Sequence, residues 1–259
     1  MLVPVPGVSA FRRRRAPTHQ GAAGASLRKR LHINSLITQE GSAEVEAGGA
    51  LSLTGDLAGT FSLPTVLKYT PPSSSTEFNV SFDSLVDDLD ATHFSDRVTL
   101  GLTHEFAPWH GLSLAAGPQV SLFTRGESGA RLGAVALARA SLAGQIDGGL
   151  TATYSQATHT SATNPAGLLD LGGGFGRQLR PHITAHANYL YEKATGYSPQ
   201  HSLYEGIEFQ FTPHVALDLS VQQVGVGSAV LDHQFVAGLT INLGPPTHWL
   251  RRRHEKLPK

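Results

Sequence analysis

The feature that most constrains this chain is an alternation of apolar and polar residues that restarts many times. One run is Val98 to Phe106, and another is Val215 to Gln222. Successive side chains of an extended strand point to opposite faces, so each run places apolar groups on one face and polar groups on the other. Strands of about ten residues that recur in this way are typical of a transmembrane β-barrel.

Breaks at clusters of Gly, Pro, Asn, Asp and Ser divide residues 41–244 into about twelve candidate strands. Their predicted bodies are residues 42–54, 60–70, 76–85, 96–107, 111–124, 130–142, 145–156, 167–177, 182–192, 202–212, 214–224 and 233–243. An even count lets both termini lie on the periplasmic side. We therefore predict an all-β fold, an antiparallel transmembrane β-barrel of about twelve strands in an up-and-down meander.

The predicted connections alternate in length. The short ones are residues 71–75, 108–110, 143–144, 179–181 and 213. The longer, polar ones are 86–95, 157–166, 193–201 and 225–232, with 55–59 and 125–129 of intermediate length. Outer-membrane barrels have short periplasmic turns and longer external loops, so this pattern gives the barrel a direction in the membrane.

The two faces of the strands differ in charge. The face assigned to lipid carries almost none, as a bilayer demands, since Lys or Arg at its midplane would cost about 2–4 kcal/mol. Its members are Phe61, Leu63, Leu67, Tyr69, Phe78, Val80, Phe82, Val98, Leu100, Leu102, Phe106, Ile146, Leu150, Tyr154, Ile183, Tyr189, Tyr191, Ile207, Phe209, Phe211, Phe235, Leu239, Ile241 and Leu243.

The opposite face predicts a wet interior. Its members are Glu44, Glu46, Lys68, Glu77, Asp83, Arg97, Glu105, Gln119, Arg131, Arg139, Asp147, Asp170, Arg177, His182, His186, Glu208, Gln210, Asp218, Gln222, Gln234 and Asn242. We expect some of them to line a path for solutes, where paired Arg and carboxylate groups set the field at the narrow point. These lumen-lining candidates are Arg97, Glu105, Arg131, Arg139, Asp147, His182, His186, Glu208 and Asp218.

Length and charge fit one β domain with two basic tails. The chain has 259 residues and a formal net charge of zero, which argues against a strongly basic nucleic-acid surface. We assign residues 1–40 to a disordered basic tail, 41–244 to the barrel and 245–259 to a second basic tail. Residues 1–38 contain a basic stretch without the apolar core of an export signal, so the start codon is set wrongly, a leader has been removed, or the tail is unusual.

Several segments resemble a known family. Glu40 to Gly48 and Leu63 to Tyr69 resemble the opening strands of the outer-membrane barrels of the phenol-degradation MetA-pathway family. Thr212 to Asp218 resembles its penultimate turn and strand, and Phe235 to Gly244 its last strand. The resemblance spans about residues 40–244, with a departure at Thr70-Pro71-Pro72-Ser73, where the family usually has a Gly-Leu-Thr-Asp type of turn. It implies a transport-related outer-membrane protein, often associated with aromatic-compound catabolism, and it brings no catalytic residues.

The candidate metal and nucleotide sites are better explained otherwise. His182 and His186 would lie about 13 Å apart on a strand, too far to share one metal. The acidic loop from Asp87 to His93 lacks the glycine-spaced pattern of calcium loops. The glycine run from Gly172 to Gly176 has no βαβ context, so we expect close strand approach or a curved wall there, not a nucleotide site. We predict no metal and no cofactor.

These observations together predict a bacterial outer-membrane channel or transporter for small solutes, with hydrophobic or aromatic compounds among the candidates. The expected partners are the lipid bilayer, a small-molecule solute and the barrel-assembly machinery during insertion, with no nucleic acid, and the protein is expected to be a monomer or a small homo-oligomer. No nucleophile motif surrounds His104 or His214, so we do not expect an enzyme. Two alternatives stay open, a non-conducting structural or adhesive outer-membrane protein and a soluble β-sandwich binding module, since the same alternation also fits an apolar core.

Overall fold

The computed structural model describes residues 38–52, 61–62, 64–83, 85–86, 97–107, 111–123, 129–142, 146–161, 164–225 and 232–244. The two predicted tails lie outside the described residues, except for residues 38–40. Leu63 and the acidic loop from Asp87 to His93 also lie outside them, as do the side chains of Phe61 and Asp83. Among the described residues, no helix is long and apolar enough to cross a membrane.

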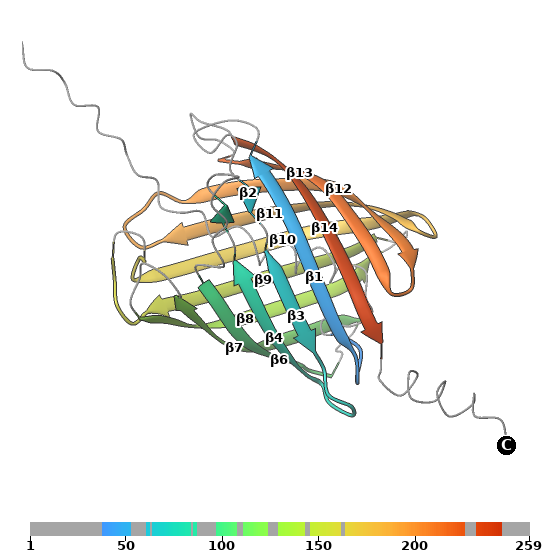
Figure 1. Cartoon of the computed structure of the whole chain (residues 1–259), viewed down its shortest axis with the longest axis horizontal. Helices are drawn as coiled ribbons and strands as arrows, with labels where there is room; N and C mark the ends of the chain where they lie inside the picture. Colours follow the sequence, from blue (N-terminus) through green and yellow to red (C-terminus); the bar gives the residue numbers. More distant parts are fainter. Residues whose placement is uncertain are drawn as a thin grey trace, which may run out of the picture.

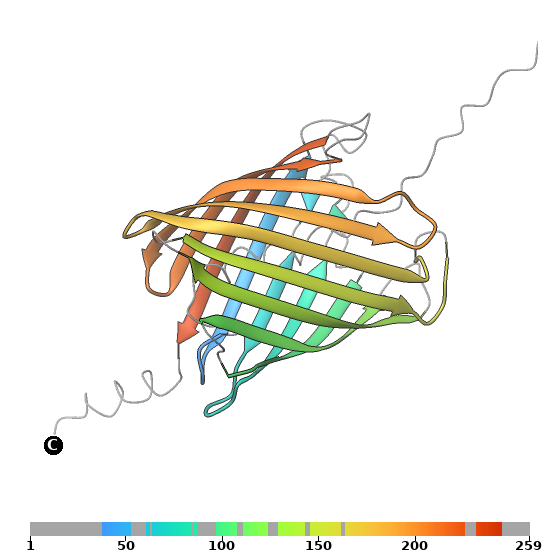
Figure 2. The ribbon, with the colours of Figure 1, turned by 180° about the vertical axis from the view of Figure 1, so that it is seen from behind.

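The described strands follow one another around a single sheet (Figures 1 and 2). They are β1 (Ala43–Ser52), β2 (Phe61–Ser62), β3 (Thr65–Tyr69), β4 (Thr76–Asp83), β5 (Leu85–Val86), β6 (Arg97–Glu105), β7 (Leu112–Phe123), β8 (Ala130–Leu142), β9 (Ile146–Ala157), β10 (Gly167–Arg180), β11 (Ile183–Ala194), β12 (Gln200–Thr212), β13 (Val215–Val224) and β14 (Asp232–Gly244). The first and last of these pair antiparallel from Ala43↔Gly244 to Ser52↔Gln234, and this pairing closes the sheet into a barrel.

Two of the strand segments are continuations of their neighbours. The pair Ala50↔Ser62 between β1 and β2 keeps the register of Ala47↔Thr65 between β1 and β3, with a break at Pro64, whose ring nitrogen has no hydrogen to donate. In the same way β5 continues β4, so the fourteen described segments form twelve wall strands. The predicted antiparallel barrel and its strand count are confirmed. Because the sheet closes on itself, the soluble β-sandwich is excluded.

The predicted strand bodies match the observed ones to within a few residues. The largest difference is in β10, which continues through Arg180, where residue 177 was the predicted end. An irregularity between Gln178 and Arg180 lets the strand keep its pairing with β11 over these additional residues. The connections at one end of the barrel, which we call the turn end, have two to six residues, and those at the other, the loop end, have five to ten.

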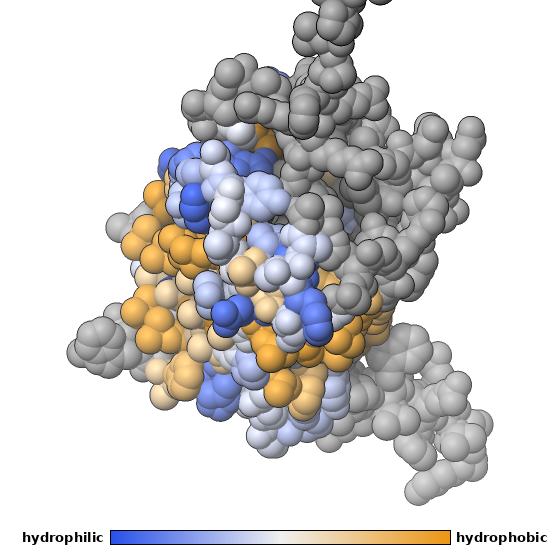
Figure 3. Space-filling view, turned by 90° about the vertical axis from the view of Figure 1, so that its left-hand side faces the viewer, coloured by the Kyte–Doolittle hydropathy of each residue, from blue (hydrophilic) through white to orange (hydrophobic). Residues whose placement is uncertain are grey.

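The outer face of the wall is apolar and exposed. Large hydrophobic side chains on it include Leu67, Tyr69, Phe78, Leu100, Leu102, Phe106, Leu150, Tyr154, Tyr189, Ile207, Phe211, Phe235, Leu239 and Leu243, all predicted to face lipid. Figure 3 shows such residues along the left-hand margin of one face, with hydrophilic residues gathered between the hydrophobic patches. The inner positions are mainly polar and buried, among them Glu44, Lys68, Thr103, Asn188 and Gln222.

Two charged side chains depart from the predicted division of the faces. Arg177 was assigned to the interior together with Asp170, but the two are an odd number of residues apart on a regularly paired stretch of β10, and Arg177 is exposed on the outer face. The outer face also carries Glu205, an exposed carboxylate near the middle of β12, paired with Ala187 and Val221. The prediction for Arg177 was therefore wrong, and the lipid-facing surface is less uniformly uncharged than expected.

Glycines on the inner face make room for polar side chains of the next strand. A Cβ built at Gly174 would lie 1.9 Å from Oδ1 of Asn188, and one at Gly206 would lie 2.8 Å from Cε1 of His186. The side chains of Asn188 and His186 therefore extend sideways across these glycines. Close approach, the predicted explanation for the glycine run at Gly172 to Gly176, is confirmed at Gly174.

The closest backbone approach of this kind is at Gly117 of β7, where a Cβ would lie 1.8 Å from the carbonyl oxygen of Leu102 in β6. We expect Gly117→Ala to push the two strands apart and to lower the free energy of unfolding by about 1–3 kcal/mol. The matched control is Gly238→Ala, since its new methyl would have only the Cβ of Asp218 nearby, at 3.7 Å. A urea titration of the folded fraction in lipid vesicles measures both variants. Equal midpoints for the two would contradict the prediction.

Candidate solute pathway in the barrel interior

The structure places nearly all of the predicted lumen residues on inward positions. Thr103 is buried on the inner face, so Arg97 and Glu105 share its orientation by alternation along β6. Glu208 is paired with the buried Asp218 across β12 and β13. The buried side chains of Arg131, Arg139 and His186 point inward, and so does Asp147, which contacts Arg139. His182 is different, since it lies exposed in the turn between β10 and β11.

A buried group of charges lies at the turn end of β1 and β3. Lys68 contacts two carboxylates of β1: its Nζ lies 3.3 Å from Oε1 of Glu44, and it also donates to Glu46. Neighbouring Glu77 is fully buried, and its Oε2 accepts a hydrogen bond of 2.8 Å from the backbone N–H of Thr38. The segment entering β1 is therefore held against the inner face of the wall.

A second ion pair joins β8 to β9 near the same end. The Nη2 atom of Arg139 lies 3.1 Å from Oδ2 of Asp147, whose other carboxylate oxygen accepts a hydrogen bond of 2.7 Å from Ser141. Both residues were predicted from the alternation, and the structure shows that they contact each other directly. This pair holds one positive and one negative charge at the interior surface.

A histidine, an aspartate and a serine meet on the inner faces of β11 and β13. Nε2 of His186 lies 2.5 Å from Oδ2 of Asp218, and the hydroxyl of Ser220 donates to Oδ1 of the same carboxylate at 3.1 Å. In nucleophilic catalysis the serine must contact the imidazole that takes its proton. Here the serine is bonded to the carboxylate, and the second ring nitrogen of His186 faces the amide of Asn188. The three residues thus form a structural polar network.

Arg131 links the loop end of the wall to the connection between β9 and β10. Its side chain is 1 % exposed, and it donates to Oδ1 of Asn164 at 2.7 Å and to the carbonyl of Pro165 at 2.8 Å. It also bonds the hydroxyl and carbonyl oxygens of Ser155 in β9. The guanidinium therefore fastens this connection to the wall from inside the barrel.

Three further charges surround Arg131 at the loop end. Asp170 interacts electrostatically with both Arg97 and Arg131, and Glu192 interacts with Asp170 and Arg97. Glu192 was not among the predicted lumen residues, although it lies six residues from His186 and therefore on the same face of β11. Two arginines and two carboxylates thus form a balanced group, which we call the loop-end quartet.

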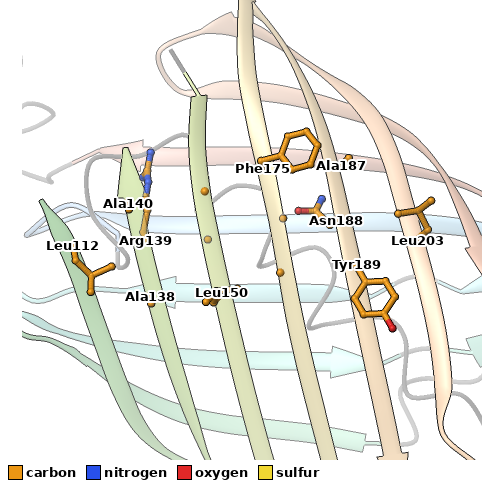
Figure 4. A pocket seen from close by; sticks show the side chains of 14 residues that line it. Leu112, Ala138, Arg139, Ala140, Leu150, Phe175, Ala187, Asn188, Tyr189 and Leu203 are labelled. Atoms are coloured by element: carbon orange, nitrogen blue, oxygen red, sulfur yellow. The ribbon is translucent and has the colours of Figure 1, made fainter. Parts of the chain in front are cut away.

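The groove in Figure 4 belongs to the outside of the wall. It has a volume of about 480 Å³ and crosses β7 to β12, where small residues such as Ala138, Ala140, Gly148 and Gly173 leave a depression in the surface. Phe175 and Tyr189 border it, and both are exposed on the lipid-facing side. The groove therefore opens on the lipid-facing side, and Arg139 and Asn188, whose side chains lie on the inner face, also contribute to its lining.

Comparison with known proteins bears on the fold. No protein-family model matches this sequence, and no curated protein matches it either. The NanC porin is similar in structure, with a TM-score of 0.60 at 6% identity, covering 76% of this chain and 98% of that porin. The KdgM porin gives 0.55 at 9% identity over 76% of this chain and 98% of its own. An outer membrane channel from Pseudomonas putida F1 gives 0.55 at 11% identity over 80% and 97%.

These similarities establish a porin-like barrel. At such low sequence identity, these similarities show the fold of this chain but do not identify its solute. The resemblance to the phenol-degradation MetA-pathway family, drawn from short segments of sequence, has no matching family model and stays a prediction.

Proposed function

We propose that this protein is an outer-membrane channel for small hydrophilic solutes. The observation that carries the proposal is a closed wall whose outer face is apolar and exposed while its inner face carries charge from one end to the other. Apolar side chains on the outside suit lipid, and ionised side chains inside require water or a polar solute around them. The similarity to porins in fold supports the same conclusion.

A charged interior favours hydrophilic solutes over the hydrophobic or aromatic compounds that the family resemblance implies. Charges reach from the loop-end quartet to Glu44 and Glu105 near the turn end. An apolar solute on this path would remove water from those groups without replacing their hydrogen bonds, at a cost in free energy. The proposal includes insertion into the bilayer by the barrel-assembly machinery.

Single-channel recording in planar bilayers tests the channel. Purified full-length protein should produce discrete conductance steps in KCl, because a hydrated interior lets small ions pass. A boiled sample of the same preparation is the control and should give none. If the native protein inserts and produces no steps, the non-conducting structural or adhesive alternative is the correct one.

Insertion is checked separately by gel mobility. A closed barrel should run as a compact species in detergent and shift after boiling, since every wall strand is paired on both sides. The absence of any shift would contradict the closed barrel itself.

A further inference from the structure

Two arginines stand on the lipid-facing side of β10 at the turn end. Arg177 and Arg180 are exposed, and they are paired with Ala185 and Ile183 of β11 on either side of the irregularity in β10. Because Thr184 is buried on the inner face, alternation along β11 turns Ala185 and Ile183 outward, and the two arginines with them. Within the part of the chain that the structure describes, no carboxylate forms an ion pair with either arginine.

The apolar groove on the outside of the wall begins beside these arginines. Phe175, which borders the groove, precedes Arg177 by two residues on the same face, a distance of about 7 Å along the strand. The lining extends from Leu112, where β7 begins at the turn end, to Leu203, in the loop-end half of β12. The rings of Phe175 and Tyr189 stand on neighbouring strands within it (Figure 4). The groove therefore leads from the turn end into the apolar band of the wall.

The size and chemistry of the groove suit one fatty acyl chain. Its outward-facing lining is apolar apart from the hydroxyl of Tyr189. The hydrocarbon layer of a bilayer contains no water to fill such a groove, so lipid or another protein must occupy it. At about 30 Å³ for a group of the size of a water molecule, its 480 Å³ hold roughly sixteen methylene-sized groups, about one acyl chain.

We propose that this groove binds one anionic phospholipid from the leaflet at the turn end. One acyl chain lies along the groove, and the phosphate of the headgroup binds Arg177 and Arg180. Guanidinium groups are well suited to this role, because their planar arrangement of donors matches two oxygens of a phosphate. The inference requires a barrel in a membrane and does not depend on whether that barrel conducts.

A carboxylate beside the groove sets the direction of the lipid. Glu205 is exposed on the outer face of β12 and is paired with Ala187, which lines the groove. The row of paired residues that contains Arg177 crosses β12 at Ile207, two residues nearer to the turn end than Glu205. Glu205 repels a phosphate and the arginines attract it, so the headgroup lies at the turn end and the acyl chain extends away from it.

Native mass spectrometry of the full-length protein in detergent, titrated with phosphatidylglycerol or phosphatidylcholine, tests the headgroup site. Wild-type protein should bind its first phosphatidylglycerol at least about ten times more tightly than phosphatidylcholine, since each arginine attracts an anionic lipid. The double variant Arg177→Gln/Arg180→Gln should reduce this preference to less than about twofold. The matched control is Lys193→Gln, which removes a cation from the outer face of β11 at the loop end and should leave the preference unchanged.

A second pair of variants tests the acyl chain. Ala187→Leu places a larger side chain in the groove beside Phe175, and should weaken the binding of both phospholipids at least about fivefold. The matched control is Ala237→Leu, the same change on the outer face of β14 and outside the groove, which should leave both affinities unchanged. The shift in gel mobility on boiling shows that each variant has a closed barrel before the titration.

Several results would overturn the lipid site. Equal wild-type affinities for the two phospholipids would do so, and this comparison needs no variant to fold. An unchanged preference in the double arginine variant would do so as well, as would an equal loss of binding in either control. Spectra dominated by dimers that Ala187→Leu converts to monomers would assign the groove to a second copy of this chain. The conductance steps test the channel function separately, so failure of the lipid site leaves that function in place.

Discussion

Replacing Lys68 with methionine is expected to lower the free energy of unfolding by about 3–5 kcal/mol. Lys68 is buried between Glu44 and Glu46, so its loss leaves carboxylates inside the wall without their shared cation. Methionine keeps most of the side-chain volume, which separates the loss of charge from the loss of packing. The urea midpoint of the folded fraction in lipid vesicles, read by gel mobility, measures the change.

Two further variants make this result specific. Lys193→Met is the matched control, because Lys193 is half-buried at the loop end of β11 and donates to the carbonyl of Tyr197. Its effect should be smaller than that of Lys68→Met, at most about 1.5–3 kcal/mol, because it removes one hydrogen bond from a charged donor. The triple variant Glu44→Gln/Glu46→Gln/Lys68→Met should recover much of the loss, since neutralising a whole buried ion group costs less than removing one member. An unchanged midpoint for Lys68→Met would show that the two glutamates do not depend on its charge.

Replacing Arg131 with methionine should release the connection between β9 and β10 from the wall. Arg131 supplies two hydrogen bonds to this connection, one to Asn164 and one to Pro165, and bonds to a charged donor contribute about 1.5–3 kcal/mol each. We expect the connection to be cut by a non-specific protease at least about ten times faster. The site of cleavage, mapped by mass spectrometry, should fall within residues 158–166.

The controls for Arg131 separate the loop contacts from the wall contacts. Ser155→Ala removes a hydroxyl that Arg131 bonds within the wall and keeps both bonds to the connection, so its cleavage rate should match that of the wild type. Arg131→Lys keeps the charge but lacks the planar fork needed to reach several acceptors, and should give an intermediate rate. A wild-type cleavage rate for Arg131→Met would mean that the connection is held by its own contacts, such as the bond from Asn164 to the carbonyl of His159.

The strands and the orientation of most side chains could be predicted because both depend on a local pattern. Alternation along β6 places Arg97 and Glu105 on one face without knowledge of any other strand. The same alternation excludes Arg177 from the interior and includes Glu192, because it continues unbroken from Asp170 to Arg177 in β10 and from His186 to Glu192 in β11. The alternation along β12 places Glu205 on the outer face, although most side chains of that face are apolar. A pattern of this kind therefore gives no warning that an isolated carboxylate will face outward.

The contacts between charges could not be predicted in the same way. The bond between Arg131 and Asn164 joins a strand to a connection 33 residues away, and periodicity contains no information about such a pair. The meeting of His186 with Asp218 depends on the register of β11, β12 and β13 taken together, and a slip of one residue would separate them. Sequence thus predicted most of the residues that enter the interior, while pairing across strands decided which of them touch.

The pairing of β1 with β14 has a consequence for how the protein reaches its folded state. These strands lie at opposite ends of the barrel sequence, so the last ladder of hydrogen bonds cannot form before β14 has left the ribosome. Until then, any sheet that has already assembled presents two long unpaired edges, which are the surfaces on which strands of other chains aggregate. We therefore expect the chain to be prone to aggregation in water until β14 has paired with β1 and the barrel has closed.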